Sequence, residues 1–340
     1  SLLSSLRLRI AATELAGADA RVTTAWIDYL PQPEIFVTSP PIFTQTQGCP
    51  MPVAEMDFES VLHAAVDEAA DSRCPPRLAA ALQHAVFPGG ARVRPKLALA
   101  VALANDCDAP ALAAAAAASA ELLHCASLVH DDLPCFDDAA QRRGRPSVHA
   151  LYGEQIAVLA GDALIVAAFS VLARPGLTAS QRLPGLLRVI AEGVGAPLGI
   201  AAGQAWESEP VVDVARYHRA KTGALFIAST AAGAVAAGVD AGPWKRLGEA
   251  IGAAYQVADD IQDATASSDD IGKPTGVDAA LERPSIVSEL GLEGATRRLR
   301  ELVAASIEAV PPCRGREELQ ELVKLQSRRF IPRACTAVAA

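Results

Sequence analysis

Residues 121–138 read ELLHCASLVHDDLPCFDD, an apolar segment that runs directly into a cluster of aspartates. The apolar residues recur at intervals of three and four positions, which predicts a helix with one buried stripe. Asp131 and Asp132 then fall on the last turns of this helix and face whatever space it lines. Carboxylates in such surroundings are costly to bury unless a cation neutralises them.

A second aspartate cluster follows more than a hundred residues later, as ADDIQD at 258–263. Residues 252–258 are again helical in period, and Asp259 and Asp263 are four positions apart, which places both on one helix face. Like charges at this spacing repel each other, so stability alone does not explain them. Oxygen ligands without interleaved His or Cys suit Mg²⁺, with Mn²⁺ as the alternative, rather than zinc. Two such helices facing each other predict a carboxylate cage, although either cluster alone is compatible with a solvated acidic loop.

Basic residues flank both clusters. Arg142 and Arg143 follow the first, and GGARVRPK at 89–96 forms a glycine turn that opens into a helix. KTG at 221–223 and Lys273 add further donors, the latter shortly after the second cluster. Arginine is well suited to bind phosphate oxygens at two points. One basic pair is usually a solvated surface. This many basic groups around two metal motifs indicate a phosphate-bearing substrate.

In order and spacing, the segments 89–95, 124–144, 221–223, 255–263 and 272–273 resemble the motif set of the trans-isoprenyl diphosphate synthases, the polyprenyl synthetase family. Within it, the phrases at 86–92, 125–134 and 255–260 look most like the geranylgeranyl diphosphate synthases of carotenoid gene clusters in purple bacteria. The resemblance implies an all-α fold, a single-domain bundle of antiparallel helices around a central substrate cavity. It also implies a homodimer.

The implied activity is magnesium-dependent condensation of isopentenyl diphosphate with an allylic diphosphate (dimethylallyl, geranyl or farnesyl). The reaction proceeds by ionisation, condensation and elimination, and its product is geranylgeranyl diphosphate. Metal contacts that strengthen as charge collects on the departing pyrophosphate would stabilise the transition state more than the ground state.

The resemblance also implies roles for individual residues. Two or three Mg²⁺ ions are expected on Asp131, Asp132, Asp137, Asp259 and Asp263. The residues expected to act in catalysis are Asp131, Asp132, Asp137, Asp259, Asp260 and Lys221. The allylic diphosphate is expected on Arg142, Lys221, Thr222, Gln256, Lys273 and Arg283, and isopentenyl diphosphate on Arg94, His124 and Arg143, with Arg92 nearby.

Some positions depart from the family pattern. Ala91 stands where most members carry a lysine that binds isopentenyl diphosphate, Arg283 replaces a usual lysine, and Val277 stands where many carry another. Arg92, Arg94 and Lys96 are the residues that would compensate at the first of these positions. We expect the departures to alter affinity more than reaction type.

Product length is the second question that the resemblance raises. In this family the chain grows along the helix of the first motif, and the residues about one turn before its first aspartate form the floor. Here these are Ala126 and Ser127, both small, which predicts a twenty-carbon product. If Leu122, Leu123 or a facing helix forms the floor instead, the alternative is a farnesyl diphosphate synthase.

Two further classes share features with this chain. A class I terpene cyclase normally replaces the second aspartate motif with an Asn/Ser/Glu-type metal site, whereas this chain has a full aspartate motif. A non-catalytic regulatory subunit of a prenyl synthase usually loses the aspartates, which this chain keeps; the lysine missing at position 91 leaves that alternative open.

Composition agrees with a helical enzyme. The chain has 340 residues, of which 51% are hydrophobic and only 4% aromatic. The net charge of -9 without a basic stripe argues against a nucleic-acid partner. Seven cysteines without a CxxC pair fit reduced thiols and a cytoplasmic location. The charge-free run 223–239 predicts a buried helix, and no transmembrane segment is expected. Residues 1–50 are expected to be a leader outside the catalytic fold, and residues 51–340 to form the prenyltransferase domain.

Overall fold

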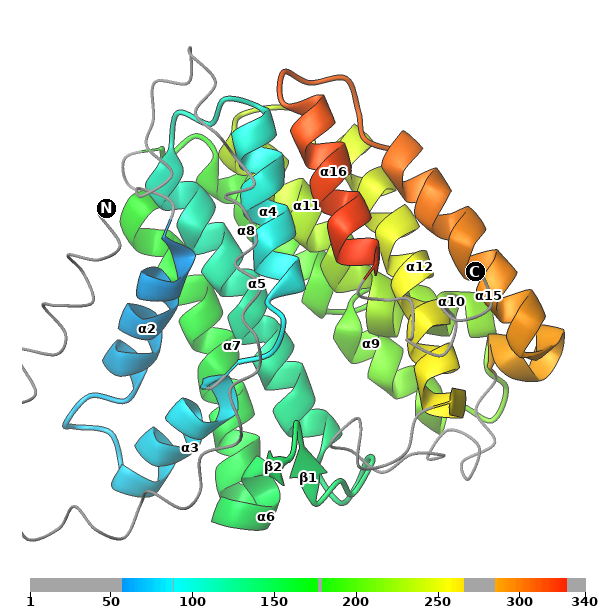
Figure 1. Cartoon of the computed structure of the whole chain (residues 1–340). Coiled ribbons are helices and arrows are strands. Elements are labelled where there is room, and N and C mark those ends of the chain that lie inside the picture. The colour runs from blue at the N-terminus through cyan, green and yellow to red at the C-terminus, as the bar shows by residue number, and fades with distance from the viewer. Residues whose placement is uncertain (1–56, 88, 177–178, 266–284, 329–340) are drawn as a thin grey trace, which may run out of the picture. The chain divides into compact units, whose positions relative to one another are not determined.

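The computed structural model describes residues 57–87, 89–176, 179–265 and 285–328, and this part of the chain is a helical bundle (Figure 1). The expected all-α fold is therefore confirmed. The leader expected at 1–50, the departing position Val277 and the expected ligands Lys273 and Arg283 lie outside the described residues. The elements are α2 (Phe58–Ala69), α3 (Pro76–Val86), α4 (Val93–Ala104), α5 (Pro110–Asp131), β1 (Gln141–Arg142), β2 (Arg145–Pro146), α6 (Val148–Tyr152), α7 (Glu154–Gly176), α8 (Leu183–Val194), α9 (Ile200–Ala205), the 3₁₀ turn η3 (Trp206–Ser208), α10 (Val214–His218), the π turn η4 (Arg219–Gly223), α11 (Ala224–Ala236), α12 (Gly242–Thr265), α15 (Ile286–Glu308) and α16 (Arg316–Arg328).

Helix α5 is the central element of the bundle. It begins at Pro110, whose fixed φ suits a first helical turn, and it ends at Asp131, as the sequence predicts. Alanines fill most of its first half, and those from Ala113 to Ala120 are almost completely buried, so neighbouring helices approach it closely. It packs against α7, α11, α4 and α2. The first aspartate motif is thus carried to the cavity by a helix that is enclosed on most sides.

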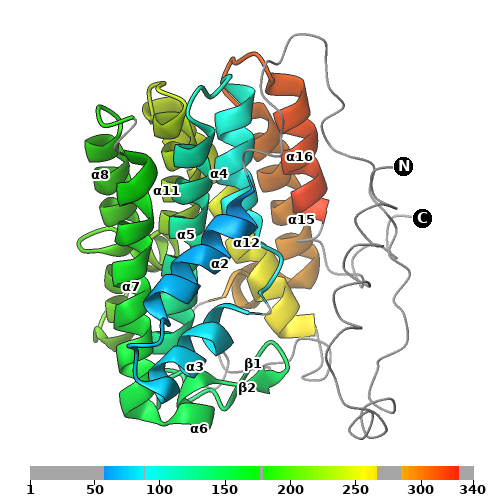
Figure 2. The same cartoon turned by 90° about the vertical axis from the view of Figure 1, so that its left-hand side faces the viewer.

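Helix α12 carries the second aspartate motif and packs against α11 and α15. Between it and α5 lies α11, which covers most of the charge-free run and is buried along nearly its whole length, as predicted. Gly233 of α11 allows close contact with α4, because a Cβ there would lie 2.2 Å from the Ala98 carbonyl oxygen. Figure 2 shows α7 and α8 at one edge of the bundle and α15 and α16 at the other.

Two helices, α5 and α7, are long and apolar enough to cross a membrane by length and composition. In α5, 83% of the apolar window is buried inside the bundle, which explains its composition. In α7 the buried share is 39%. Its outer face exposes Val158, Leu159 and Val166, so α7 presents apolar surface that the described part of the chain does not cover.

Candidate active site

The first aspartate motif forms a compact turn at the end of α5. The Asp137 amide donates to the Asp131 carbonyl at 3.0 Å, and the Ala139 amide donates to the Asp132 carbonyl at 3.1 Å. These bonds fold the loop back and bring the Asp137 side chain beside that of Asp131. Glu207 of η3 joins them, and one carboxylate oxygen from each of the three lies within 4.8 Å of the others. Asp131 and Asp137, both expected to bind metal, offer oxygen ligands of the kind that a hard divalent cation such as Mg²⁺ prefers.

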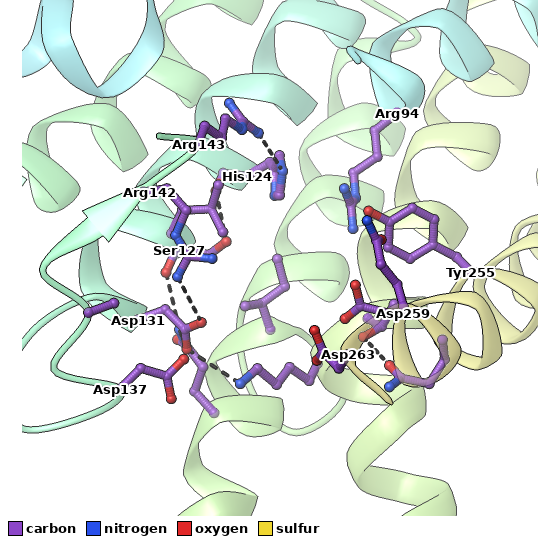
Figure 3. Close-up of a pocket in the computed structure, with 18 of the residues that line it drawn as sticks. Arg94, His124, Ser127, Asp131, Asp137, Arg142, Arg143, Tyr255, Asp259 and Asp263 are labelled. Atoms are coloured by element: carbon purple, nitrogen blue, oxygen red, sulfur yellow. Dashed lines mark hydrogen bonds and ion pairs between the residues drawn. The ribbon is translucent and has the colours of Figure 1, made fainter. Parts of the chain in front are cut away.

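The second motif faces the first across a cavity of about 350 Å³. Asp131 and Asp137 lie on one side of it and Asp259 and Asp263 of α12 on the other (Figure 3). Asp259 and Asp263 project from adjacent turns of one helix face, as their spacing predicts. The two carboxylate pairs therefore line one cavity, the first from the end of α5 and its following loop and the second from α12.

Negative charge is concentrated at the first motif. Burial raises the pKa of Asp131, and the nearby Asp137 and Glu207 also raise it, against the opposing effects of Lys221 and Arg142. The Lys221 ammonium lies 3.5 Å from Asp131 Oδ1 and 2.6 Å from Glu207 Oε1. Lys221 thus pairs with two carboxylates, and a bound cation would further lower the electrostatic cost of placing these carboxylates close together.

The second aspartate of each motif turns to a different partner. Both guanidinium nitrogens Nε and Nη2 of Arg142 donate to Asp132, the Nε bond at 2.8 Å. Asp260 accepts hydrogen bonds from the Ile286 amide at the start of α15 and from Gln256 Nε2, each at 2.8 Å. Asp132 was expected to bind metal and Asp260 to act in catalysis, but the structure engages both in protein contacts beside the cavity.

Basic residues line the remaining wall. Arg94, His124 and Arg143 lie above the aspartates in Figure 3, with Arg94 on the side of Tyr255. Arg142 and Lys221 lie nearer to the first aspartate motif. The Arg94 guanidinium carbon stands 4.4 Å from the centroid of the Phe226 ring and 5.6 Å from that of Tyr255. Its buried Nε has no hydrogen-bond partner among the described residues. Burial lowers the pKa of Arg94, so an anion bound here would stabilise its charge.

His124 is held in its neutral form. Burial, followed by the positive charges of Arg94 and Arg143, lowers its pKa well below the usual value. Arg143 Nη2 lies 3.5 Å from His124 Nε2. A neutral imidazole in this position can hydrogen-bond a phosphate without adding to the crowded positive charge.

Arg92 lies elsewhere. Its φ of 52° is left-handed, and its side chain turns inward, where Nη1 donates to Glu121 Oε1 at 2.5 Å and Nη2 to the Val86 carbonyl at 3.1 Å. Both Arg92 and Glu121 are buried. Although Arg92 was expected near isopentenyl diphosphate, the structure makes it part of a buried ion pair that links α4 to α5.

Thr222 and Gln256 line the cavity as expected and are bonded to each other, with the Thr222 hydroxyl donating to Gln256 Oε1. Of the two residues predicted to set chain length, Ser127 lines the cavity, whereas Ala126 is buried in the packed core of α5. Leu122 and Leu123, one turn deeper, are also fully buried.

Among the polar residues of the site, Gln204, Glu207 and Tyr217 escaped sequence reasoning. Gln204 Nε2 donates to the Ser127 carbonyl and to Asp131 Oδ1, each at 3.2 Å. The segments that carry them are short and lack helical periodicity in the sequence, so no pattern brought them to the aspartates.

The helical fold and a cavity lined by both carboxylates and arginines are features of one class of helical enzymes. A model of the polyprenyl synthetase family matches residues 75–324. The chain is 50% identical over 278 residues to the geranylgeranyl diphosphate synthase of Cereibacter sphaeroides, covering 82% of this chain and 96% of that protein. It is 51% identical over 274 residues to the enzyme of the same name from Rhodobacter capsulatus, covering 81% and 95%.

Among solved structures, a geranyltransferase from Helicobacter pylori in complex with magnesium and isoprenyl diphosphate superposes with a TM-score of 0.66 at 30% identity. That likeness covers 82% of this chain and 98% of that one. The chain belongs to the polyprenyl synthetase family.

Proposed function

We propose that this protein is a magnesium-dependent trans-prenyltransferase that condenses isopentenyl diphosphate with allylic diphosphates to geranylgeranyl diphosphate. The observation that carries the proposal is one cavity with Asp131 and Asp137 on one side and Asp259 and Asp263 on the other. The nitrogen donors that line it beyond them belong to Arg94, His124 and Arg143. The names of the two half-identical relatives support the twenty-carbon product.

In this proposal the allylic diphosphate lies between Asp131 and Asp259, and its leaving oxygens contact Lys221, Thr222 and Arg142. When bound, Mg²⁺ supplies the positive charge that draws the diphosphate to the carboxylates and stabilises the departing pyrophosphate. The carbon–oxygen bond of the allylic substrate breaks, the double bond of isopentenyl diphosphate attacks the resulting cation, and a proton is lost.

Isopentenyl diphosphate is assigned to the other wall. Arg94 offers an unpartnered Nε, while Arg143 and the neutral His124 complete a donor set for its phosphates. This arrangement keeps the two diphosphates on separate basic groups and directs their hydrocarbon ends toward each other. Orientation of this kind contributes a large part of catalysis in bimolecular reactions.

The functional test is incubation of the purified protein with Mg²⁺, labelled isopentenyl diphosphate and, separately, the five-, ten- and fifteen-carbon allylic diphosphates. A twenty-carbon product supports the proposal. A fifteen-carbon stop would favour the farnesyl diphosphate synthase alternative. A folded protein that binds Mg²⁺ and pyrophosphate but condenses no starter would favour the regulatory-subunit alternative.

We also propose a cytoplasmic homodimer that uses the outer face of α7. Leu159 and Val166 there are 52% and 68% exposed, and Leu151 of α6 is 50% exposed. A two-fold contact would pair this face with itself. Sedimentation of wild type and Val166→Glu tests the proposal: a dimer that becomes a monomer supports it, and an unchanged wild-type monomer contradicts it.

A further inference from the structure

Two short elements lie face to face beside the first aspartate motif: α9 with η3, and α10 with η4. Gly203 on the first makes their close approach possible. A Cβ at Gly203 would lie 2.3 Å from the Lys221 amide nitrogen and 2.4 Å from its Cα. The backbone of Lys221 is therefore pressed against α9.

Glu207 lies four residues after Gly203 and faces the side chains of the opposite element. Its Oε1 accepts hydrogen bonds from the Tyr217 hydroxyl at 2.7 Å and from Lys221 Nζ at 2.6 Å. Tyr217 is only 7% exposed, and the Glu207 side chain 11% exposed. Charge-assisted hydrogen bonds in such surroundings are strong and fix geometry.

The position of Lys221 explains why such a restraint matters. A lysine side chain has a flexible four-carbon stem, and here it projects from a π turn rather than from a regular helix. Its ammonium lies 3.5 Å from Asp131 Oδ1, so without a second partner it would move closer to this carboxylate. Glu207 holds the ammonium from the other side, and Tyr217 fixes the rotation of Glu207.

We propose that Glu207 and Tyr217 are positioning residues that hold the Lys221 ammonium beside the first aspartate motif, where it meets the diphosphate of the allylic substrate. The inference rests on the proposed function for the identity of that substrate. Glu207 acts through Lys221, and Tyr217 acts through Glu207. Neither residue needs to contact the reacting carbons.

The experiment compares Glu207→Gln, Glu207→Asp and Tyr217→Phe with the wild type. Glu209→Gln is the matched control, because it removes an exposed carboxylate two residues away. The measurements are kcat, KM for the allylic and for isopentenyl diphosphate at saturating Mg²⁺, and the affinity of inorganic pyrophosphate with Mg²⁺ by calorimetry. Melting temperatures show whether each variant folds.

Loss of the Tyr217 hydroxyl should raise the allylic KM and weaken pyrophosphate binding by about tenfold, the effect of one buried hydrogen bond. Glu207→Gln should have a larger effect in the same direction, Glu207→Asp should restore part of it, and Glu209→Gln should match the wild type. KM for isopentenyl diphosphate should not change, which a general loss of structure would not reproduce.

Two results would overturn the inference. One is that Glu207→Gln and Tyr217→Phe, both folded, leave the allylic KM and pyrophosphate affinity unchanged. The other is that Glu207→Gln changes only the Mg²⁺ concentration required, which would make Glu207 a metal ligand instead. A wild type that condenses no substrate would reject the proposed function, while the pyrophosphate titrations would still decide the role of Glu207.

Discussion

The two aspartate motifs look alike in sequence, but the structure holds them differently. The first lies where a helix ends, and backbone hydrogen bonds within the following loop place Asp137 beside Asp131. The second lies inside α12, and the helical repeat alone places Asp263 beside Asp259. In both, the first aspartate faces the cavity and the second binds a protein partner.

This division has a simple geometric cause. Successive residues in a helix point about 100° apart, so two adjacent carboxylates cannot both face one cavity. Asp132 is left to bind Arg142, and Asp260 is left to hold the first amide of α15. A pair of aspartates therefore combines one residue for the ligand with one that stabilises the surrounding structure.

The largest predicted effect on turnover follows from substituting Asp131 or Asp259, the aspartates that face the cavity. Asp131→Asn and Asp259→Asn should each lower kcat by about 100- to 1,000-fold or more, because each removes charge that holds the metal–diphosphate complex. Both proteins should keep the wild-type circular dichroism spectrum. Steady-state kinetics with a farnesyl starter measures the loss, and normal turnover in either variant would remove the basis for the carboxylate cage.

Substitution of the aspartates that bind protein partners, Asp132 and Asp260, should affect stability first. Asp132→Asn removes the charge partner of the half-buried Arg142, and the breaking of a buried pair typically costs roughly 3–5 kcal/mol. Because 21% of the Arg142 side chain stays exposed, solvent should reduce that cost. Urea unfolding measures the change. An Asp132 variant as stable as the wild type would contradict this structural role.

Asp260→Ala should have a smaller effect on stability. It leaves the Ile286 amide without its acceptor, at a cost of about 1–3 kcal/mol. The loss should appear as earlier proteolysis at the start of α15 and as a lower melting temperature. If Asp260→Ala instead keeps its stability and loses all turnover, both aspartates of the second motif act on the ligand, and the division described above fails there.

Removal of the metal should distinguish the aspartates that face the cavity from those that bind protein partners, because only the former should contribute to stabilisation by the ligand. Mg²⁺ with pyrophosphate at 100 times its dissociation constant should stabilise the wild type by about 2.7 kcal/mol. EDTA should abolish this gain. The gain should disappear in Asp131→Asn and persist in Asp260→Ala, as thermal melts with and without the ligands can measure. Equal gains in both variants would break the distinction.

The smallest predicted effect lies on the basic wall and concerns pH. The native pKa of His124 is lowered, so the unfolded chain binds a proton there before the native protein does. Stability should be unaffected by this group above about pH 6.5 and should fall as the pH drops below it toward the lower native pKa. His124→Asn should lose that part of the acid dependence. An identical pH profile of unfolding would show that His124 does not contribute.

Sequence reasoning was most successful where one helix carries the information. The end of α5 at Asp131, the shared face of Asp259 and Asp263 and the buried helix α11 follow from periodicity within single segments. It was least successful for contacts that join separate elements. Arg92 pairs with Glu121, and Glu207 meets Tyr217 and Lys221, contacts that no local pattern encodes.

The sequence by itself determined the helical class, the two metal motifs and the charge types that surround them, because these depend on residue identity and short-range spacing. Only the tertiary structure decided which aspartate of each pair faces the cavity, that Ser127 rather than Ala126 lines it, and that Glu207 stands beside Lys221. The physical reason is that packing fixes how far each helix is rotated about its axis. That rotation, set by contacts with every neighbouring helix, decides where each side chain points.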